Sequence, residues 1–583
     1  MPGLTVVRGT DELDDASLSK SLENVRFLDW YEVHEDFHAS STYVGHVGYE
    51  EYPVETVEFD GGLAVLEGYL YDVEDTAEEV RKVAEWMQEG DSANLERWLE
   101  SRDGDFVVLT VDESNGDVRA LTDVLARLPT YYATIGDTVV VSRELKFVRS
   151  VARELNEPTN LDRIGAAQML LFGYTLGTRT LYSDVERISP GSMLTVDDRG
   201  ASTRRVHEYD FDSYDYADRS IEENAEALAE LFIEACERRG RIADQHIISL
   251  SGGLDSRAVA AGYSRAGVPT TAATFTVGDG DSEEGNVAEI VADELDIPWQ
   301  LYAVPRSDRA TSLLLETKQG MNYLGMSFIY EFFERLREDV GPASYVTGDG
   351  GDKVLENLMP GNDPSSEAEL VEEIVDSNSI FSLETAAEMT GVSTEELRNS
   401  VRDRVRSYPE SDLSNRYVHY LLRERGMNWL THGEDRNRYY YPSVAPFYAR
   451  PVYEYAMNCP AEQKRGRKLY RAFLEALSPA MVDIRNANFG APINSTEYAL
   501  KKRFYEELGR VPTVKKTIVS LVKREFGQSH PEITGPINEL LRDDASGLDP
   551  GVVSEIIGDG RSYSKSELSH LYTVVAADAG RIA

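Results

Sequence analysis

Short apolar runs separated by glycine and aspartate dominate the first part of the chain. Such runs span residues 61–73, 104–112, 137–145 and 191–200, a pattern typical of strands in antiparallel sheets. Between them, residues 76–90 place apolar side chains at helical spacing and end in glycine, which predicts a helix. We therefore expect a β-rich unit with a few packed helices.

From about Ile221 the pattern changes to strands alternating with helices. Strands are predicted at 247–250, 271–277, 300–303 and 343–348, and helices at 221–240, 256–266 and 284–295. This alternation predicts a parallel sheet with helices on both faces. After about Asp363 we expect no strands, only amphipathic helices such as 366–377, 393–408 and 469–478.

The length of 583 residues exceeds what one hydrophobic core usually organises. We predict two domains, 1–205 and 206–583. The second should have an α/β core to about residue 362 and be mainly helical thereafter. The loop at 361–367 reads as a surface linker, and the segment after about residue 511 matches no pattern that indicates a role.

The net charge of −44 excludes general nucleic-acid binding, because such a surface repels phosphate backbones. No apolar run is long enough to span a membrane, and the N-terminus lacks the features of a secretory signal, so we expect a cytoplasmic protein. Acidic residues are dispersed and lysine is scarce, which favours a halophilic, salt-accumulating host over an ordinary acidic cytosolic protein. The two cysteines, Cys236 and Cys459, show no metal-site spacing.

The segment Ser-Gly-Gly-Leu-Asp-Ser, residues 251–256, lies where the first parallel strand should turn into a helix. Gly252 and Gly253 allow close backbone approach to a ligand, and the following helix directs its free N–H groups to the same place. With the hydroxyls of Ser251 and Ser256, this predicts a phosphate cradle. Asp255 is then a natural Mg²⁺ ligand, since Mg²⁺ usually takes one or two carboxylates plus substrate phosphates. The alternative is a glycine-rich turn that only caps a helix.

This segment resembles the pyrophosphate-binding loop of the N-type ATP pyrophosphatases, which cleave ATP to AMP and pyrophosphate and include the asparagine synthetases. A second stretch, Tyr-Val-Thr-Gly-Asp-Gly-Gly-Asp-Lys at 345–353, resembles a segment of the asparagine synthetases. The resemblance implies that Asp352 shares Mg²⁺ with Asp255 and that Asp349 acts near the acceptor. Lys353 replaces the usual glutamate, and its role stays open.

Weaker matches follow in the order of that family. The resemblance implies that Leu250 and Val277 border the adenosine, that Thr347 and Gly348 join the nucleotide site, and that Lys468 neutralises charge on the adenylate and pyrophosphate. The alternative for Lys468 is an exposed helix lysine, since its spacing to Arg471 is one residue shorter than usual. The family's Pro-Phe pair is present as Pro446-Phe447, but Pro442 and Val444 replace its preceding glutamate and arginine.

The first part of the chain resembles the class II glutamine amidotransferase domain, through Asp123, Ser142, Glu144 and the segment 129–132. The resemblance implies an Ntn-hydrolase-like αββα sandwich, followed by the parallel α/β sheet of a PP-loop ATP pyrophosphatase with a helical extension. The family's nucleophile is a cysteine directly after the initiator methionine, and Pro2 stands there instead.

Two further positions of the predicted glutaminase site have changed. Glu67 replaces an asparagine that forms the oxyanion hole, and Tyr69 replaces a glutamate that holds the glutamine amine. We therefore expect no glutamine hydrolysis. Relatives that close β-lactam rings carry a similarly degenerate front domain.

These motifs predict an amide ligase that uses ATP and Mg²⁺ to activate a carboxylate substrate as an acyl adenylate, which ammonia or an amine then attacks. The acceptor could be aspartate with free ammonia, a sugar carboxylate, or a carboxylate and an amine in one molecule. The alternatives are a non-catalytic regulatory or assembly protein and a glutamine-dependent asparagine synthetase. The sequence also allows a homodimer. His207, His246, His419 and His432 show no metal-ligand spacing.

Overall fold

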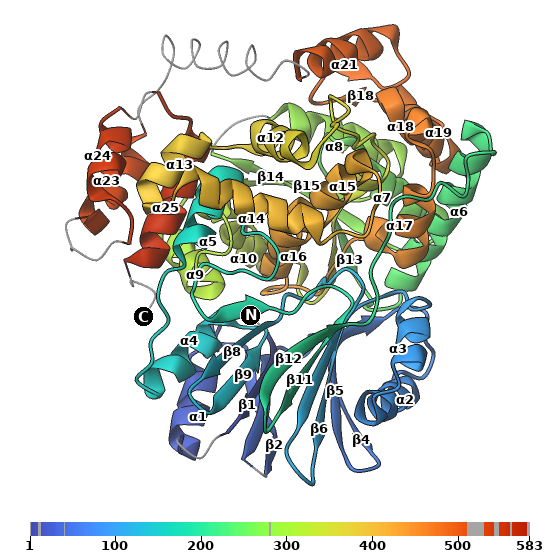
Figure 1. Ribbon diagram of the computed structural model, residues 1–583. Coiled ribbons are helices and arrows are strands. Elements are labelled where there is room, and N and C mark those ends of the chain that lie inside the picture. Colours follow the sequence, from blue (N-terminus) through green and yellow to red (C-terminus); the bar gives the residue numbers. More distant parts are fainter. Residues whose placement is uncertain are drawn as a thin grey trace.

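The computed structural model describes residues 2–9, 13–39, 41–278, 282–509, 530–541, 547–559 and 562–579. In the C-terminal segment to which the sequence assigns no role, residues 511–529, 542–546, 560–561 and 580–583 lie outside these ranges. In Figure 1 a two-sheet sandwich fills the lower part of the molecule and the parallel sheet with its helices fills the upper part. The predicted fold class is confirmed.

Two six-stranded antiparallel sheets form the sandwich. The first sheet has the order β10-β8-β9-β1-β3-β2 and the second β12-β11-β7-β6-β5-β4. Their bounds are β1 (Gly3–Arg8), β2 (Glu32–Ala39), β3 (Thr42–Gly48), β4 (Val54–Phe59), β5 (Gly62–Leu70), β6 (Gly104–Asp112), β7 (Val118–Thr122), β8 (Tyr131–Ile135), β9 (Thr138–Ser142), β10 (Val185–Arg187), β11 (Ser192–Asp197) and β12 (Gly200–Arg205).

Strand alternation decides what each face of the sandwich covers. Leu4 and Val6 of β1 point into the apolar layer between the two sheets, whereas Val7 points outward beneath the helices. Helices α1 (Asp15–Glu23) and α4 (Leu145–Glu154) cover the outer face of the first sheet, and α2 (Thr76–Glu89) and α3 (Ser92–Leu99) cover that of the second. The arrangement is helix, sheet, sheet, helix.

The parallel sheet has the strand order β15-β14-β13-β16-β17. The chain enters at the central strand, runs outward to β15, and returns to the other side of β13 through β16. The ends of β13 and β16 therefore meet where the strand order reverses, which is where sheets of this kind bind ligands. The bounds are β13 (His246–Ser249), β14 (Thr271–Val277), β15 (Trp299–Val304), β16 (Ser344–Val346) and β17 (Ser443–Val444).

Helices cover both faces of this sheet. Ile248 of β13 packs with α6 (Ile221–Arg239), α7 (Leu254–Ala266) and α8 (Glu283–Glu294), and its neighbour Ile247 packs on the side of α9 (Asp308–Lys318) and α10 (Phe328–Val340). The cluster around Ile247 also contains residues of the sandwich and of the C-terminal helices. The two halves thus share apolar contacts, and a domain boundary at 205/206 stays a prediction.

The expectation that strands end at about Asp363 is wrong in one place that matters. Ser443 and Val444 form β17, which extends the parallel sheet, and Thr347 N donates to Val444 O at 2.9 Å. A strand of two residues is too short to show an alternating pattern, so tertiary pairing alone defines it. Two further two-residue strands, β18 (Arg485–Asn486) and β19 (Ala491–Pro492), pair with each other.

The remaining described elements are helical. They are α5 (Arg163–Phe172), η2 (Leu324–Met326), α11 (Gly351–Val354), α12 (Glu367–Asn378), α13 (Leu383–Thr390), α14 (Thr394–Arg406), α15 (Leu413–Tyr420), the π-helix η3 (Leu421–Leu430), α16 (Thr431–Asn437), η4 (Pro446–Tyr448), α17 (Arg450–Met457), α18 (Ala461–Lys464), η5 (Arg465–Arg467), α19 (Lys468–Leu477), α20 (Ala480–Asp483), α21 (Thr496–Gly509), α23 (Pro531–Leu541), α24 (Pro550–Gly558) and α25 (Lys565–Asp578). Across the described ranges, no helix combines the length and the apolarity needed to cross a bilayer.

Candidate active site

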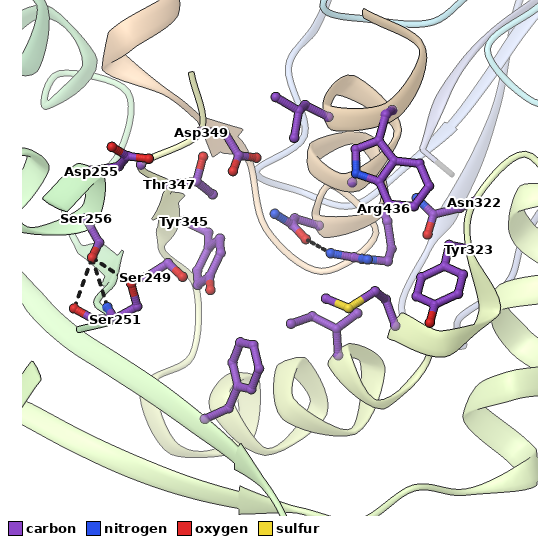
Figure 2. A pocket seen from close by; sticks show the side chains of 18 of the residues that line it. Ser249, Ser251, Asp255, Ser256, Asn322, Tyr323, Tyr345, Thr347, Asp349 and Arg436 are labelled. Carbon is purple, nitrogen blue, oxygen red and sulfur yellow. Dashed lines mark hydrogen bonds between the residues drawn. The ribbon is translucent and has the colours of Figure 1, made fainter. Parts of the chain in front are cut away.

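The loop after β13 has the form that the sequence predicts. β13 ends at Ser249, and Gly253 is the N-cap residue of α7. Ser256 Oγ accepts a hydrogen bond from Ser251 N at 3.0 Å, and Gly253 N donates to Ser251 Oγ at 3.2 Å. Figure 2 shows Ser251 and Ser256 joined in this way beside Asp255. The loop is thus held by its own hydroxyls, with the N-terminus of α7 directed at the same place.

Gly348 and Gly351 allow the segment 348–352 to lie against the serine-glycine loop at 251–256. A Cβ atom on Gly348 would lie 2.6 Å from Ser256 N, and one on Gly351 would lie 2.7 Å from Asp255 Oδ1. Gly348 is therefore required, since a Cβ there would meet backbone, whereas a side chain at position 351 would displace the Asp255 carboxylate. The segments at 251–256 and 348–352, far apart in sequence, therefore meet at the ends of β13 and β16.

Asp255 lies in a strongly acidic setting. Its burial and the negative charge of Asp352 raise the pKa of Asp255 to about 7. The Tyr470 hydroxyl donates to Asp255 Oδ1, and Lys353 Nζ pairs with Asp352 Oδ2. Within the described ranges no three His, Cys, Asp or Glu side chains gather as a metal site. The pair Asp255 and Asp352 still fits Mg²⁺ that is also bound by substrate phosphates, because Mg²⁺ needs few protein carboxylates and a proton-binding carboxylate pair attracts cations.

A cavity of about 410 Å³ extends from this loop toward α16. Six predicted site residues line it: Ser251, Asp255, Ser256, Thr347, Gly348 and Asp349. Figure 2 shows Asp255 and Asp349 on one side of it and Arg436, Asn322 and Tyr323 across from them. The structure thus brings the phosphate loop and the predicted acceptor residue to one space.

Asp349 lies where β16 ends, close to two arginines. Burial raises the pKa of Asp349, and the positive charges of Arg127 and Arg436 oppose that rise. A carboxylate with a raised pKa can take up a proton near neutrality more readily than an ordinary aspartate. Asp349 is therefore suited to accept a proton from an amine.

The other predicted residues do not line this cavity. Gly252 and Gly253 lie in the loop itself, Leu250 is buried at 1 % exposure, and Val277 is 39 % exposed at the end of β14. Asp352 lies next to the cavity with its side chain 45 % exposed. Lys468 is exposed at the first residue of α19, and its catalytic role stays a prediction. The residue of α19 that contacts Asp255 is Tyr470.

Several cavity residues were not predicted from the sequence. They come from the segment after α9, from η3 and from α16: Met321, Asn322, Tyr323, Trp429, Gly433, Arg436 and Asn437. The π-helix η3 runs directly into α16, and π-helical turns often occur at functional sites. The run Glu-Asp-Arg-Asn-Arg at 434–438 is a visible charge cluster, but nothing in its spacing indicates which side chain faces a ligand.

In the sandwich, the position of the glutaminase site is filled by a buried carboxylate. Glu67 has 0 % exposure; its Oε2 accepts from Leu4 N at 2.8 Å and its Oε1 from Arg143 Nε at 2.9 Å. The Tyr52 hydroxyl also donates to Glu67. Pro2 is buried directly before β1, and Tyr69 of β5 stacks on Tyr71. A negative charge here would repel the oxyanion that amide hydrolysis generates.

The same network connects the sandwich to α16. Arg143 Nη2 donates to Asp435 Oδ1 at 2.7 Å, and Lys318 pairs with the other oxygen of Asp435. Arg127 of the sandwich pairs with Glu434, and the Tyr31 hydroxyl donates to Tyr439 O at 2.6 Å. The sandwich thus fixes the helix whose Gly433, Arg436 and Asn437 line the cavity.

Three solved structures match parts of the chain at low similarity. An allosteric regulatory enzyme of purine biosynthesis is 12 % identical, with 64 % of this chain and 77 % of that chain covered and a TM-score of 0.22. Glutamine phosphoribosylpyrophosphate amidotransferase from B. subtilis is 13 % identical (71 % and 94 % covered, TM-score 0.23), and NMN synthetase from Francisella tularensis is 14 % identical (38 % and 95 % covered, TM-score 0.18). TM-scores this low do not establish a shared fold or function.

Comparison with curated proteins gives no match. Two family descriptions do match: a glutamine amidotransferase domain at residues 65–209 and asparagine synthase at residues 227–429. The asparagine synthase match supports an ATP-dependent ligase. With the amidotransferase domain first and the asparagine synthase domain second, the chain has the architecture of the asparagine synthetase family.

Proposed function

We propose that this protein is an ATP-dependent amide ligase that forms AMP and pyrophosphate and does not hydrolyse glutamine. One observation carries the proposal: the serine-glycine loop, Asp255 and Asp349 line one cavity, and Asp352 lies beside Asp255. The asparagine synthase match supports the same class of reaction.

The loop and the N-terminus of α7 bind the β- and γ-phosphates of ATP through backbone N–H groups and the hydroxyls of Ser251 and Ser256. Mg²⁺, held by Asp255 and Asp352, would neutralise phosphate charge. A substrate carboxylate oxygen forms a bond to the α-phosphorus as the bond to pyrophosphate breaks. This leaves an acyl adenylate, and the walls of the cavity hold the reacting groups in line.

An amine or ammonia then attacks the acyl carbon, and AMP leaves with the bonding electron pair. The nitrogen loses a proton as the amide forms, and Asp349 is placed to accept it. The nitrogen source is free in solution, since Pro2 and Glu67 stand where the family has its nucleophile and an oxyanion donor.

A second candidate is a protein that keeps the fold without catalysis. The observation that favours it is the pairing of both carboxylates with side chains of the chain itself, Asp255 with Tyr470 and Asp352 with Lys353. Lys468 is also exposed and does not line the cavity. If these pairings persist when nucleotide is present, no cation joins Asp255 to a triphosphate.

The test is exchange of labelled pyrophosphate into ATP, with a panel of carboxylic acids and Mg²⁺. We expect exchange in the wild type and a fall of at least about 100-fold in Asp255→Ala, because the cation loses a ligand. The matched control is Asp198→Ala, an aspartate whose side chain is 96 % exposed. Circular dichroism checks the fold of both variants.

Two outcomes would overturn the proposal. Absence of exchange with every acid, together with absence of ATP binding, would favour the non-catalytic candidate. Release of glutamate from glutamine by the wild type would instead show that the sandwich has kept a glutaminase function.

A further inference from the structure

Arg436 faces the cavity as a buried guanidinium with few partners. It is only 7 % exposed, and its Nε has no hydrogen-bond partner among the residues that the structure describes. Its one hydrogen bond, from Nη2 to Asn437 Oδ1, is long at 3.3 Å. A buried charge without a counter-ion is costly, so a position like this indicates a missing anionic partner.

The neighbouring buried arginines show what a satisfied one looks like. Arg143 pairs with Glu67 and Asp435, and Arg438 pairs with Glu434. Within the described part of the chain, no carboxylate lies within ion-pair distance of Arg436, although the negative charge of Asp349 acts on it from farther away. The guanidinium is therefore free to bind an anion that enters the cavity.

Charge is distributed unevenly along the cavity. Arg436 is the only arginine or lysine among the described residues that line it; of the two lining carboxylates, Asp255 belongs to the phosphate loop, and Asp349 lies close enough for its charge to act on Arg436. His570 lies behind the cavity wall, where its ring stacks on Tyr323 at 4.3 Å. Burial lowers the pKa of His570 to about 3, so this ring adds no second positive charge.

Apolar side chains make up a large part of the cavity lining, beside the polar Asn322 and Asn437. The apolar lining residues are Met321, Met326, Ile329, Trp429 and Leu430, together with Phe275. Such a lining favours a substrate with an aromatic or aliphatic body, because apolar surface that the substrate buries against it stabilises the complex. Aspartate alone has no such body.

We propose that Arg436 binds a distal anionic group of the acceptor, so that the substrate is a dicarboxylic acid with an apolar or aromatic body. One carboxylate reacts beside Asp349, and the other pairs with the guanidinium of Arg436. This assignment rests on the proposed ligase function for the identity of the reacting carboxylate. The assignment adds the class of substrate and the residue that selects this class.

The binding test uses aromatic diacids of increasing length: terephthalate, 4-carboxyphenylacetate and 3-(4-carboxyphenyl)propionate. Each is compared with its monoamide, in which one carboxylate attached to the ring is replaced by a neutral carboxamide. Isothermal titration calorimetry is carried out with Mg²⁺ and a non-hydrolysable ATP analogue. We expect at least one diacid to bind the wild type about 30-fold more tightly than its amide, as a charge-assisted pair predicts.

The variant Arg436→Met keeps the volume and removes the charge. It should bind diacid and amide equally, while its affinity for the ATP analogue is unchanged. Arg436→Lys should restore part of the preference. The matched control is Arg306→Met, an exposed arginine that donates to Gly325 O at 3.1 Å near the same loop and does not line the cavity. It should behave as the wild type.

A purely structural role for Arg436 predicts the opposite pattern. Arg436→Met would then be less stable than the wild type, whereas loss of an unpaired buried charge should leave the melting temperature unchanged or raise it. The inference is overturned if no diacid binds the wild type, or if Arg436→Met keeps the preference for diacids.

These outcomes are distinct from failure of the ligase proposal. Diacid binding that depends on Arg436, without pyrophosphate exchange, would keep the binding site and reject the chemistry. Exchange that is equal for diacids and amides would keep the chemistry and reject the role of Arg436.

Discussion

At the scale of single residues, Asp255 makes binding of a cation depend on pH. Its pKa is raised to about 7 by burial and by Asp352, whereas an aspartate in the unfolded chain ionises near pH 4. Between these values the folded chain holds a proton that the unfolded chain has lost. This group therefore stabilises the metal-free fold fully below about pH 4 and loses that contribution as the pH rises to about 7.

We predict that Mg²⁺ raises the melting temperature little at about pH 5 and increasingly through about pH 7, because the cation binds the ionised carboxylate. The measurement is the difference in melting temperature between Mg²⁺ and EDTA across this range. Asp255→Asn should show no such rise. Tyr470→Phe should shift the rise to higher pH, because the Tyr470 hydrogen bond lowers the pKa of Asp255. An effect of Mg²⁺ that does not vary with pH would contradict the assignment.

At the scale of elements, α16 depends on buried ion pairs with the sandwich. Burial raises the pKa of Asp435, but Lys318, Arg143 and Arg438 outweigh burial and hold it well below its usual range. Asp435 thus remains ionised and contributes stability that is lost only in strong acid. Its removal would leave the Arg143 and Lys318 charges buried with one fewer partner.

We predict that Asp435→Asn lowers the free energy of unfolding by about 3–5 kcal/mol, as for other broken buried ion pairs. Asp198→Asn, which removes the exposed partner of Arg8, should cost less than about 1 kcal/mol. Urea unfolding followed by circular dichroism compares the two. We also expect Asp435→Asn to weaken diacid binding, because α16 carries Arg436. Equal urea midpoints for both variants would show that the sandwich does not hold α16 in this way.

Elements with strong local signals could be predicted, and residues defined by tertiary contacts could not. The strand, glycine pair and helix at 247–266 carry periodicity and turn chemistry within one short window, so their form and the place of Asp255 followed from sequence. β17 has two residues and exists through pairing with β16. Arg436 was missed because 434–438 is a run of mixed charges in which nothing local shows which side chain faces the cavity. The role of Lys468 stays a prediction, since a short spacing left the register of α19 open.

At the scale of the whole molecule, the net charge of −44 acts against a compact fold. Exposed charges repel over about 10 Å at 0.1 M salt and over about 3 Å at 1 M, so concentrated salt removes most of this repulsion. The buried pairs around Asp435 are shielded from solvent and should be far less sensitive. Salt should therefore stabilise the fold through its surface and leave the α16 network unchanged.

We predict that the melting temperature rises steadily as KCl increases from about 0.1 M to about 2 M, where the Debye length becomes shorter than the spacing of surface charges. Sorbitol at matched osmolality is the control for preferential exclusion, and it should give a smaller rise. The deficit of Asp435→Asn relative to the wild type should stay constant along the series, because its lost pairs are buried. A melting temperature that is highest at low salt would reject adaptation to a salt-rich interior. A deficit that disappears at high salt would show that solvent reaches the network between the sandwich and α16.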